Sequence, residues 1–378
     1  MRILHTSDWH IGKNDGEQSL LDDQKFFIDS ICSIAEKEKV DAVIIAGDVY
    51  DRQIASSEAV NLYDYAMTKL CKDLKKKVII VAGNHDSAER LSTCSDLLSV
   101  AGLYVSGSLK RDPDVVVFNG VDVYLLPWFT TEKAKSVFSE QSDKIESYDD
   151  AYKVVLENIK NKFDKSKKHI LVSHAFITDS ETSTSDRAAE IGAATQVSAN
   201  LFGGFDYVAL GHIHKPQNVN SFIRYSGTPM PYSFGKEEKQ EKSVTVVDTD
   251  SLTREIIPVP LLHKRTTLSG PYEELLEAKC AEDVRKGYVR LEVTDSYIGL
   301  QTLSELKTVY PNIVEVQGKT YDSGDSTVTL TLEELKRIES DPIEVFKQFC
   351  KDEIGEESDE HKVELFRQAI KKVEEEQV

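Results

Sequence analysis

The chain has 378 residues, of which 40% are hydrophobic and 29% are charged, and its formal net charge is −19. This composition is typical of a globular protein, and the length favours two or three domains. No segment approaches the roughly 20 consecutive apolar residues of a membrane-spanning helix, so we expect no membrane association. The negative charge argues against a protein that binds nucleic acid without a partner, because contacts with phosphates require a basic surface.

The start of the chain and its cysteines indicate a cytoplasmic protein. Met1–His5 leads directly into a polar cluster, so we expect no secretory signal. The five cysteines are odd in number, widely separated and without a Cys-x-x-Cys pair. This pattern favours reduced thiols over disulfides or zinc sites.

Residues 1–263 alternate short apolar runs with amphipathic segments, which is the pattern of an α/β domain. Helices are predicted around Leu20–Ile34 and Val60–Leu74, where apolar residues recur at helical spacing. Most predicted strands are near-continuous apolar runs, as in strands that are covered on both faces. They are Arg2–Thr6, Ala42–Ala46, Val78–Ala82, Asp122–Leu126, His169–Ser173 and Tyr207–Leu210.

The pattern breaks near Lys264–Gly270, where we predict a domain boundary. Beyond it, Gly287–Thr294 is predicted to be a strand, Thr302–Tyr310 a helix and Ile313–Gln317 a second strand, which together make a small α+β module. The sequence therefore predicts three parts, which are residues 1–263, 264–335 and 336–378.

Two helices are predicted in the C-terminal part. Asp341-Pro342 would begin the first, because Pro is favoured at the first helical position, and Gly355 would end it. Ser358 is a candidate N-cap of the second helix. The apolar side chains either pack onto the preceding module or dock on a partner protein, and helical spacing alone leaves both open. These side chains are Phe346, Phe349, Leu365, Phe366 and Ile370.

Five predicted strands run directly into polar residues. In open α/β sheets, ligands bind just beyond the carboxyl ends of the strands, where a rigid sheet brings together side chains from distant parts of the sequence. The five segments are Ile3–His10, Ile44–Asp51, Ile80–Asp86, Ile170–His174 and Ala209–His214.

The polar residues of these segments form a candidate metal site. They offer oxygen and imidazole ligands without thiolates, which suits Mn²⁺, Fe²⁺ or Zn²⁺. Two such ions about 3.5–4 Å apart can hold both oxygens of a phosphoryl displacement and activate a water molecule. Asp48 is the natural bridge, because each of its two carboxylate oxygens can face one ion. The candidate ligands are Asp8, His10, Asp48, Asn84, His174, His212 and His214.

Each segment taken alone has a simpler structural explanation. Asp8-x-His10 could be a surface turn, Gly47-Asp48 a helix cap, and Gly83–Asp86 a tight turn with a left-handed residue. His174 could be a core histidine. Gly-His-x-His is more informative, because alternate residues of a strand point to the same side. All five in this order, each at a strand end, favour the metal site.

These residues resemble the calcineurin-like metallophosphoesterase superfamily. The matching positions are Asp8-x-His10, Gly47-Asp48-x-x-Asp51, Gly83–Asp86, His174 and Gly211-His212-x-His214. Within that superfamily, three longer stretches resemble the SbcD nuclease subunits. They are Met1–Gly12, Asp206–Gln217 and Arg224–Phe234, and the resemblance is weaker from residue 265 onward.

The resemblance implies a two-sheet sandwich flanked by helices, a small α+β capping domain that faces DNA, and a C-terminal helical tail. The tail would dock on a coiled-coil ATPase of the SbcC type. The resemblance also implies a homodimer of the nuclease subunit and two divalent ions, usually Mn²⁺. Such complexes use ATP to degrade double-stranded DNA ends in the 3′-to-5′ direction, cut single strands and open hairpins, in DNA repair, recombination and replication.

Residue by residue, the resemblance assigns metal binding to the seven candidate ligands. It places His85 at the catalytic histidine, which would stabilise or protonate the departing oxygen. Asp86 is expected to orient His85. Asp51 stands where archaeal and eukaryotic relatives have a second histidine, so the role of that histidine does not transfer to this chain.

The main alternative is a phosphomonoesterase such as a protein Ser/Thr phosphatase, because Arg52 could clamp a phosphate. Trp9, Asp86 and the module beyond residue 263 argue against it. A non-catalytic scaffold that retained the fold would be indicated by the loss of a ligand, and none of the candidate ligands is missing.

Overall fold

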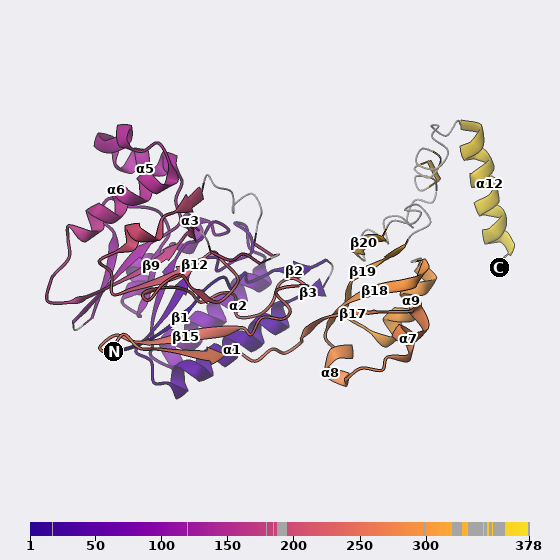
Figure 1. The fold of residues 1–378 in the computed structure, drawn as a ribbon, viewed down its shortest axis with the longest axis horizontal. Helices are drawn as coiled ribbons and strands as arrows, with labels where there is room; N and C mark the ends of the chain where they lie inside the picture. The colour runs from indigo at the N-terminus through magenta and orange to yellow at the C-terminus, as the bar shows by residue number, and fades with distance from the viewer. Residues whose placement is uncertain are drawn as a thin grey trace. The chain divides into compact units, whose positions relative to one another are not determined.

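In the computed structural model, the chain forms two compact units. One comprises Met1–Asn14 and Ser19–Leu262, and the other comprises Asp15–Gln18 and His263–Val378. We refer to them as unit 1 and unit 2, and Figure 1 shows their elements. The structure describes all residues except 17, 119, 179, 184, 187–194, 298–299, 320–326, 332–342, 344–345, 348–349, 351–359 and 377–378.

The first sheet of unit 1 has the strand order β16-β15-β1-β4-β5-β6. Strands β1, β4, β5 and β6 are parallel, whereas β15 and β16 are added in antiparallel orientation beside β1. The strands are β1 Arg2–Thr6, β4 Ala42–Ala46, β5 Lys77–Val81, β6 Leu103–Ser106, β15 Ser243–Asp248 and β16 Arg254–Pro258.

The second sheet of unit 1 has the order β13-β14-β12-β9-β8-β7. Its four inner strands are parallel, and each edge strand pairs antiparallel with its neighbour. The strands are β7 Asp114–Phe118, β8 Val121–Leu126, β9 Lys168–His174, β12 Tyr207–Gly211, β13 Gln217–Asn218 and β14 Ile223–Tyr225.

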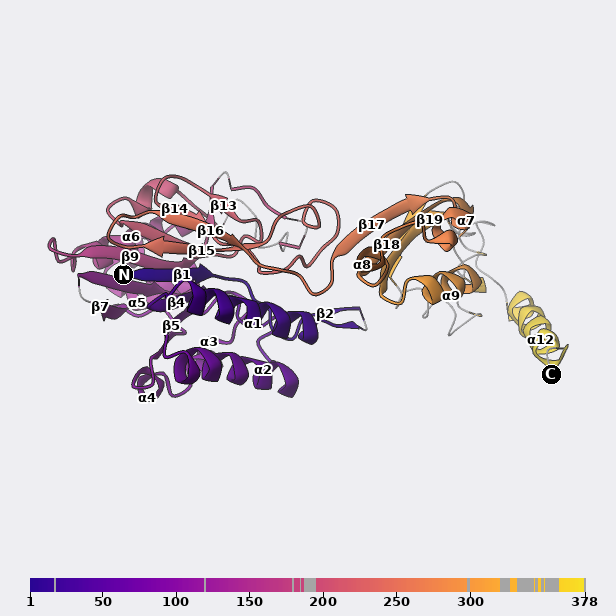
Figure 2. The same cartoon turned by 90° about the horizontal axis from the view of Figure 1, so that it is seen from below.

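The two sheets pack face to face and form a sandwich. One apolar core contains Ile44 and Ile79 of the first sheet together with Val123 and Ile170 of the second. The alternation of side chains along each strand sends the other apolar residues outward, where helices cover them (Figure 2). The predicted two-sheet sandwich flanked by helices is therefore confirmed.

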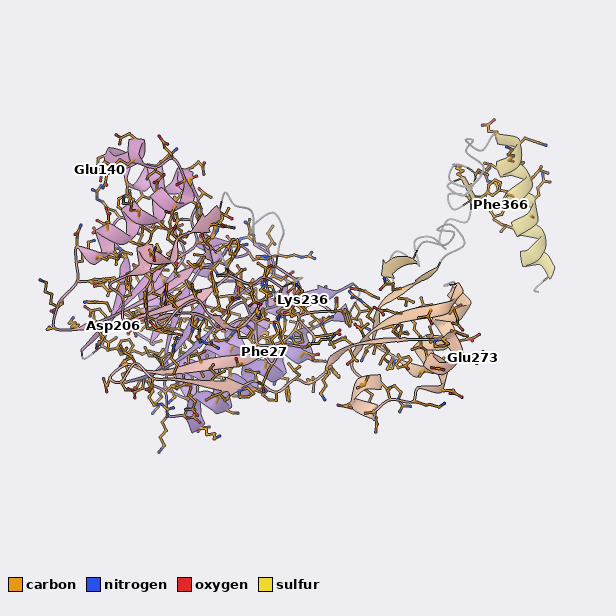
Figure 3. The ribbon with its side chains drawn as sticks, in the orientation of Figure 1. Phe27, Glu140, Asp206, Lys236, Glu273 and Phe366 are labelled. Atoms are coloured by element: carbon orange, nitrogen blue, oxygen red, sulfur yellow. The ribbon has the colours of Figure 1, made fainter. Side chains whose placement is uncertain are left out.

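Helix α1 (Leu21–Lys37) shows why these helices form. Its buried residues Phe27, Ile31 and Ala35 recur every four positions and make one apolar face. Phe27, labelled in Figure 3, packs edge-on against Trp9 with ring centroids 5.8 Å apart. Trp9 is itself fully buried and directly precedes His10. The packing of α1 thus fixes the loop that follows β1.

The other helices of unit 1 vary in length. Helix α2 (Ser57–Met67) continues into a π-helical segment, η1 (Thr68–Asp73). Helix α6 (Tyr148–Lys160) begins with a capping box formed by Ser147 and Asp150. The shorter elements of unit 1 are α3 Ala88–Leu91, α4 Ser95–Ser99, α5 Thr131–Val137, η2 Ser139–Lys144, β10 Phe176–Ile177, β11 Gln196–Val197 and η4 Ala199–Phe202. The short strands β2 Asn14–Asp15 and β3 Gln18–Ser19 each have one residue in unit 1 and one in unit 2.

Unit 2 is built on a four-stranded sheet in the order β17-β18-β19-β20. Its core contains Val289, Leu291, Leu306 and Ile313, packed between the sheet and its helices. The predicted strand–helix–strand module is present, and β17 and β20 extend it on both sides. The elements are β17 Arg265–Gly270, α7 Tyr272–Glu277, α8 Glu282–Arg285, β18 Tyr288–Tyr297, α9 Leu300–Val309, β19 Ile313–Lys319, β20 Thr327–Thr331 and α12 Glu360–Glu376.

Helix α12 corresponds to the second helix predicted in the tail, whereas most of the first, from Asp341 to Gly355, lies outside the described residues. The rings of Phe346 and Phe366 stack with centroids 4.3 Å apart, so these two apolar residues pack on each other. Among the described helices, none combines the length and the apolar character needed to cross a membrane.

Candidate metal centre

The predicted site residues lie where five strands of unit 1 end. They come from both sheets, because β1, β4 and β5 belong to the first sheet and β9 and β12 to the second. Asp8 and His10 follow β1, Asp48 follows β4, Asn84 and His85 follow β5, His174 ends β9, and His212 and His214 follow β12.

The two sheets approach each other closely at this point. The ring Nδ1 of His174 donates a hydrogen bond to the carbonyl oxygen of Ala46 at 2.9 Å, so a ligand of one sheet is fixed by a strand of the other. A Cβ atom on Gly211 would lie 1.8 Å from that same oxygen. Only glycine fits there, which explains the Gly that precedes His212.

The backbone of the site is strained. Asp8, His10, Asp48 and His212 have φ angles of 53°, 45°, 47° and 100°, a region that side chains other than glycine rarely adopt. Each such residue costs about 1–3 kcal/mol and persists only where its surroundings enforce it. Here the backbone N–H of His10 donates to the carbonyl of Asp48, and that of His212 donates to the Asp8 carboxylate. The strained positions therefore hold one another in place.

One group of side chains able to hold a cation consists of Asp8, His10 and His214. The Nε2 atoms of His10 and His214 face each other at 3.1 Å. Two imidazole nitrogens that converge beside a buried carboxylate can share a metal ion. The other ring nitrogen of His10, Nδ1, is buried without a hydrogen bond within the described part of the chain, and it faces the Asp51 carboxylate at 3.6 Å.

A second group consists of Asp8, Asp48 and His174. Asn84 and His212 join it, because Oδ1 of Asn84 lies 2.8 Å from Nε2 of His174 and 3.1 Å from Nδ1 of His212. The seven predicted ligands thus fall into two adjoining groups.

Asp48 lies between these groups. Its Oδ2 is 3.4 Å from Nε2 of His174 and 3.8 Å from Nε2 of His10, so one carboxylate reaches the histidines of both. Its Oδ1 accepts the backbone N–H of His85 at 2.9 Å. A Cβ atom on Gly83 would lie 2.1 Å from this Oδ1, so the glycine makes room for the carboxylate.

Burial and crowded charges shift the pKa values of the site. Burial lowers the pKa of His212 to about 3 and that of His214 to about 4, so both rings are neutral, the form that binds metal ions. Burial raises the pKa of Asp8 to about 8, and the neighbouring Asp48 adds to this effect. Burial tends to raise the pKa of Asp48 as well, but nearby histidines, His174 foremost, outweigh this effect and hold the pKa well below its usual range. A divalent cation would favour the ionised carboxylates.

The structure changes the role expected for Asp86. Its carboxylate accepts the backbone N–H groups of Val49, Tyr50 and Gly83 at 2.9–3.1 Å, so it ties together the loops after β4 and β5. The Nδ1 atom of His85 lies instead 2.9 Å from the backbone carbonyl of Asp51. The expectation that Asp86 orients the His85 ring is therefore replaced by orientation through Asp51.

Asp51 was not among the predicted site residues, yet it lies at the edge of the site. Its carboxylate accepts a hydrogen bond from Lys13 at 2.9 Å and lies 3.6 Å from Nδ1 of His10. His10, Asp51 and His85 make up a third group with suitable geometry for a cation.

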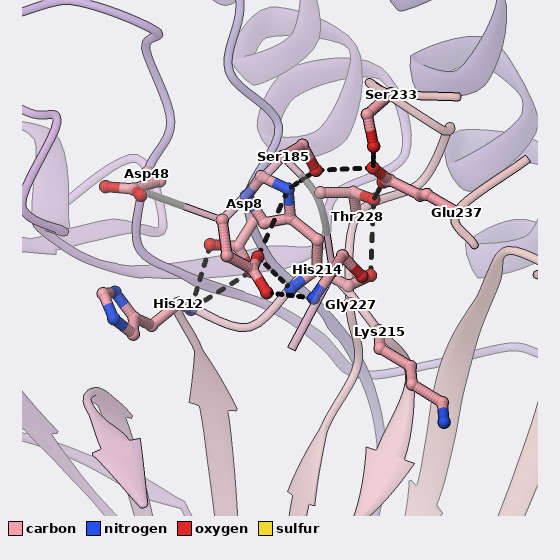
Figure 4. Close-up of polar contacts among 12 residues, drawn as sticks. Asp8, Asp48, Ser185, His212, His214, Lys215, Gly227, Thr228, Ser233 and Glu237 are labelled. Atoms are coloured by element: carbon pink, nitrogen blue, oxygen red, sulfur yellow. Dashed lines mark hydrogen bonds and ion pairs between the residues drawn. The ribbon is translucent and has the colours of Figure 1, made fainter. Parts of the chain in front are cut away.

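Four further polar residues surround His214 and were also missed. Figure 4 shows Ser185 and Glu237 beside its ring. Asp186 and Lys242 contact its backbone. Glu237 and Lys242 belong to the charged run Lys236–Lys242, which has the composition of a solvated loop and gave no sign of burial. Ser185 and Asp186 had no recognisable pattern around them.

Comparison with known proteins places the chain in a family. The model of the calcineurin-like phosphoesterase family matches residues 1–216, which is more than half of the chain. A second family model, described as the type 5 capsule protein repressor C-terminal domain, matches residues 260–353. The SbcD subunit of the nuclease SbcCD from Staphylococcus epidermidis is 32% identical over 377 residues, which cover 94% of this chain and 100% of that protein.

The chain belongs to the SbcD family of nuclease subunits. A second SbcD protein, from the SbcCD nuclease of Staphylococcus saprophyticus, is 31% identical over 329 residues, with 86% of this chain and 87% of that protein covered. Among solved structures, "GAP50 the anchor in the inner membrane complex of Plasmodium" overlaps with a TM-score of 0.39 at 11% identity, covering 69% of this chain and 89% of that one. The SbcD relatives and the phosphoesterase domain identify a metal-dependent nuclease.

Proposed function

We propose that this chain is the nuclease subunit of an SbcCD-type complex that acts in the cytoplasm in DNA repair, recombination and replication. It would degrade double-stranded DNA ends in the 3′-to-5′ direction with an ATPase partner, cut single strands and open hairpins. The observation that carries the proposal is the convergence of seven Asp, Asn and His side chains from five strand ends into two adjoining groups.

In this proposal, two divalent ions, Mn²⁺ by preference, would be held by the two groups. Asp8, His10 and His214 would hold one ion, Asn84, His174 and His212 would hold the other, and Asp48 would contribute to both. Bound ions would polarise the phosphate and lower the pKa of a water molecule. The facing Nε2 atoms of His10 and His214 and the neutral rings of His212 and His214 support this assignment, because a cation binds unprotonated ring nitrogens.

His85 would act on the departing oxygen. Its Nδ1 faces the carbonyl oxygen of Asp51, which can only accept hydrogen bonds. Nδ1 therefore carries a proton and donates a hydrogen bond to that oxygen. Its Nε2 lies on the side of the metal groups, 3.9 Å from Oδ2 of Asp48. When the ring is protonated, Nε2–H can give its proton to the oxygen that leaves phosphorus, and Nδ1 stays hydrogen-bonded. Asp86 would contribute by fixing the loop that carries His85.

The partners are part of the proposal. A chain with net charge −19 binds DNA poorly on its own, so an SbcC-type coiled-coil ATPase would supply the main grip. In the three-part division, residues 1–263 are the nuclease domain, residues 264–335 the capping domain and residues 336–378 the segment that docks on the ATPase. A homodimer of the nuclease subunit is also part of the proposal. The exposed apolar side chains of Ile54, Val60, Leu97 and Val100 are candidates for its contacts.

A protein Ser/Thr phosphatase remains the alternative that an experiment should separate. The side chain of Arg52, which could have clamped a phosphate, is 77% exposed and lies 3.6 Å from the Asp51 carboxylate. The discriminating assay compares hydrolysis of a hairpin DNA, a linear duplex and a phosphopeptide, with and without the ATPase partner, in Mn²⁺, Mg²⁺ and Zn²⁺. Cleavage of the hairpin without the partner, and of duplex ends only with the partner and ATP, is the expected result. Hydrolysis of the phosphopeptide alone would contradict the proposal.

A further inference from the structure

A fully buried ion pair lies directly behind His214. Glu237 and Lys242 are both 0% exposed, and their side chains meet at 2.8 Å. The Lys242 ammonium also donates to the hydroxyl of Thr228 at 2.8 Å and to the backbone carbonyl of His214 at 3.1 Å. Burying two charges costs more than their attraction returns unless hydrogen bonds satisfy them, so a buried pair is weak evidence of a purely stabilising role. Here its contacts lead to a proposed metal ligand.

Ser185 connects the ion pair to the ring of His214, as Figure 4 shows. Its hydroxyl lies 2.6 Å from Nδ1 of His214 and 2.5 Å from Oε2 of Glu237. An ionised carboxylate only accepts hydrogen bonds, and a serine hydroxyl has a single proton to donate. Ser185 must therefore donate to Glu237 and accept from Nδ1 of His214. This order of donors leaves the lone pair of His214 on Nε2, the atom that faces His10.

Glu237 is held as an acceptor from several sides. Besides Ser185, the hydroxyl of Ser233 donates to its Oε2 at 2.7 Å, and Lys242 donates to its Oε1. His214 is likewise fixed beyond its ring, because its backbone N–H donates to Asp186 at 3.0 Å. His10 differs, since its Nδ1 has no hydrogen bond within the described residues. Of these two facing rings, His214 is therefore the one whose Nδ1 is hydrogen-bonded by the surrounding protein.

We propose that Ser185, Glu237 and Lys242 form a positioning relay that fixes His214 as the tautomer protonated on Nδ1 and so presents Nε2 to the divalent cation. The relay rests on the proposed function in one respect, which is the assignment of His214 as a metal ligand. The three residues touch neither DNA nor the cation in this account. They set the affinity for the ion that His10 and His214 share.

The decisive experiment is calorimetric titration of the full chain with Mn²⁺ in the absence of DNA. Ser185→Ala removes the hydroxyl that connects Glu237 to His214. Loss of a hydrogen-bond partner of a metal ligand typically weakens metal binding about 10–100-fold. We expect a loss of that size at one of the two sites, with the other site unchanged. Ser185→Thr keeps the hydroxyl and should return the affinity to within about threefold of the original. Wild-type affinity at both sites in Ser185→Ala would overturn the relay.

Two matched variants separate the possible failures. Ser233→Ala also removes a hydroxyl that donates to Glu237, but Ser233 does not bond to His214 in the network of Figure 4, so both affinities should stay within about threefold. An equal loss in Ser233→Ala would contradict a relay that runs through Ser185. His214→Ala tests the ligand itself. If it keeps both ions, the metal assignment of the proposed function fails, whereas loss of an ion there but not in Ser185→Ala defeats only the relay.

A spectroscopic readout distinguishes positioning from simple packing. With ¹⁵N-labelled histidine in the metal-free protein, the His214 signal, assigned from its absence in His214→Ala, should show a proton on Nδ1. Ser185→Ala should shift the ring towards a mixture of tautomers, and Ser185→Thr should restore it. A proton on Nε2 in the wild-type protein would overturn the proposal, because that nitrogen would then have no lone pair for a cation.

Discussion

Units 1 and 2 both contain parallel strands over apolar cores, but their strands end differently. In unit 1, strand ends carry Asp, Asn and His, and within the described residues every group able to hold a cation lies there. In unit 2, the parallel strands β17 and β18 pack over Leu275, Leu303 and Leu306, and the sheet serves a core with no such group among its described residues. The comparison shows that a parallel sheet is only a scaffold. The residues placed immediately after the strands decide whether it carries chemistry.

The sharpest test of this contrast is removal of the carboxylate between the two groups. Asp48→Ala should lose at least one of the two ions, because the Asp48 carboxylate reaches both His10 and His174. Stabilisation of charge by metal ions is worth several kcal/mol, so loss of about 4 kcal/mol would slow cleavage about a thousandfold. Metal analysis of the purified variant, with nuclease assays in Mn²⁺, provides the check. Two ions at full occupancy would remove Asp48 from the bridging position.

Removal of the His85 ring should have a different effect from removal of the Asp48 carboxylate, although His85 lies beside the same metal ligands. His85→Ala is expected to retain both ions and lose cleavage by about 10²–10⁴-fold, the usual contribution of general acid catalysis. The matched control is His169→Ala, a buried histidine of β9 that stacks on Phe163 away from the site and should leave the cleavage rate per folded molecule unchanged. Near-normal cleavage by His85→Ala would exclude it from the mechanism.

Six strands of unit 1 were predicted, because their apolar runs are buried on both faces, and each agrees with the structure to within one residue at each end. The inner strands β14 and β15 were not predicted although they too are buried. Strands β16 and β17 were missed because they are partly exposed and have mixed composition. The seven candidate ligands were found because each follows such an apolar run.

Residues that contact the candidate ligands and fix their positions were not predicted from the sequence. Glu237 and Lys242 lie in a run of charges that resembles a solvated loop, and only the fold shows that both are buried. Asp86 was expected to orient the His85 ring. The turn instead directs the Asp86 carboxylate to backbone N–H groups. The His85 ring contacts the backbone carbonyl of Asp51, which is far from His85 in sequence. Such contacts depend on loop geometry that spacing does not encode.

The tail offers a test in which unit 1 should be unaffected. Removing residues 341–378 should leave metal binding and hydrolysis of a small phosphodiester nearly unchanged, because every candidate ligand lies in unit 1. ATP-dependent cutting of duplex ends with the partner should be lost if the tail docks on a coiled coil through apolar side chains such as Leu365, which is 54% exposed. Co-purification with the ATPase and duplex degradation are measured together. If both persist, the tail only packs internally.

The smallest effect on catalysis is expected from the core of unit 2. Leu306 is fully buried, and Leu306→Ala should lower the stability of this unit by about 2–5 kcal/mol through a cavity. Leu365→Ala, at an exposed position, should change stability by less than about 0.5 kcal/mol. Thermal unfolding measures both, and Mn²⁺ affinity should be unchanged in both. A weaker metal site in Leu306→Ala would show that the two units are not chemically separate.

The strand ends of unit 1 are proposed to hold two cations with Asp48 between them. Anomalous diffraction at the manganese edge from crystals of the Mn²⁺-loaded chain tests this proposal directly. Two peaks are predicted, one among Asp8, His10 and His214 and the other among Asn84, His174 and His212. The third geometrically suitable group, His10, Asp51 and His85, should show no peak, since His85 is proposed to act on the leaving oxygen. A single peak, or a peak liganded by His85, would contradict the account.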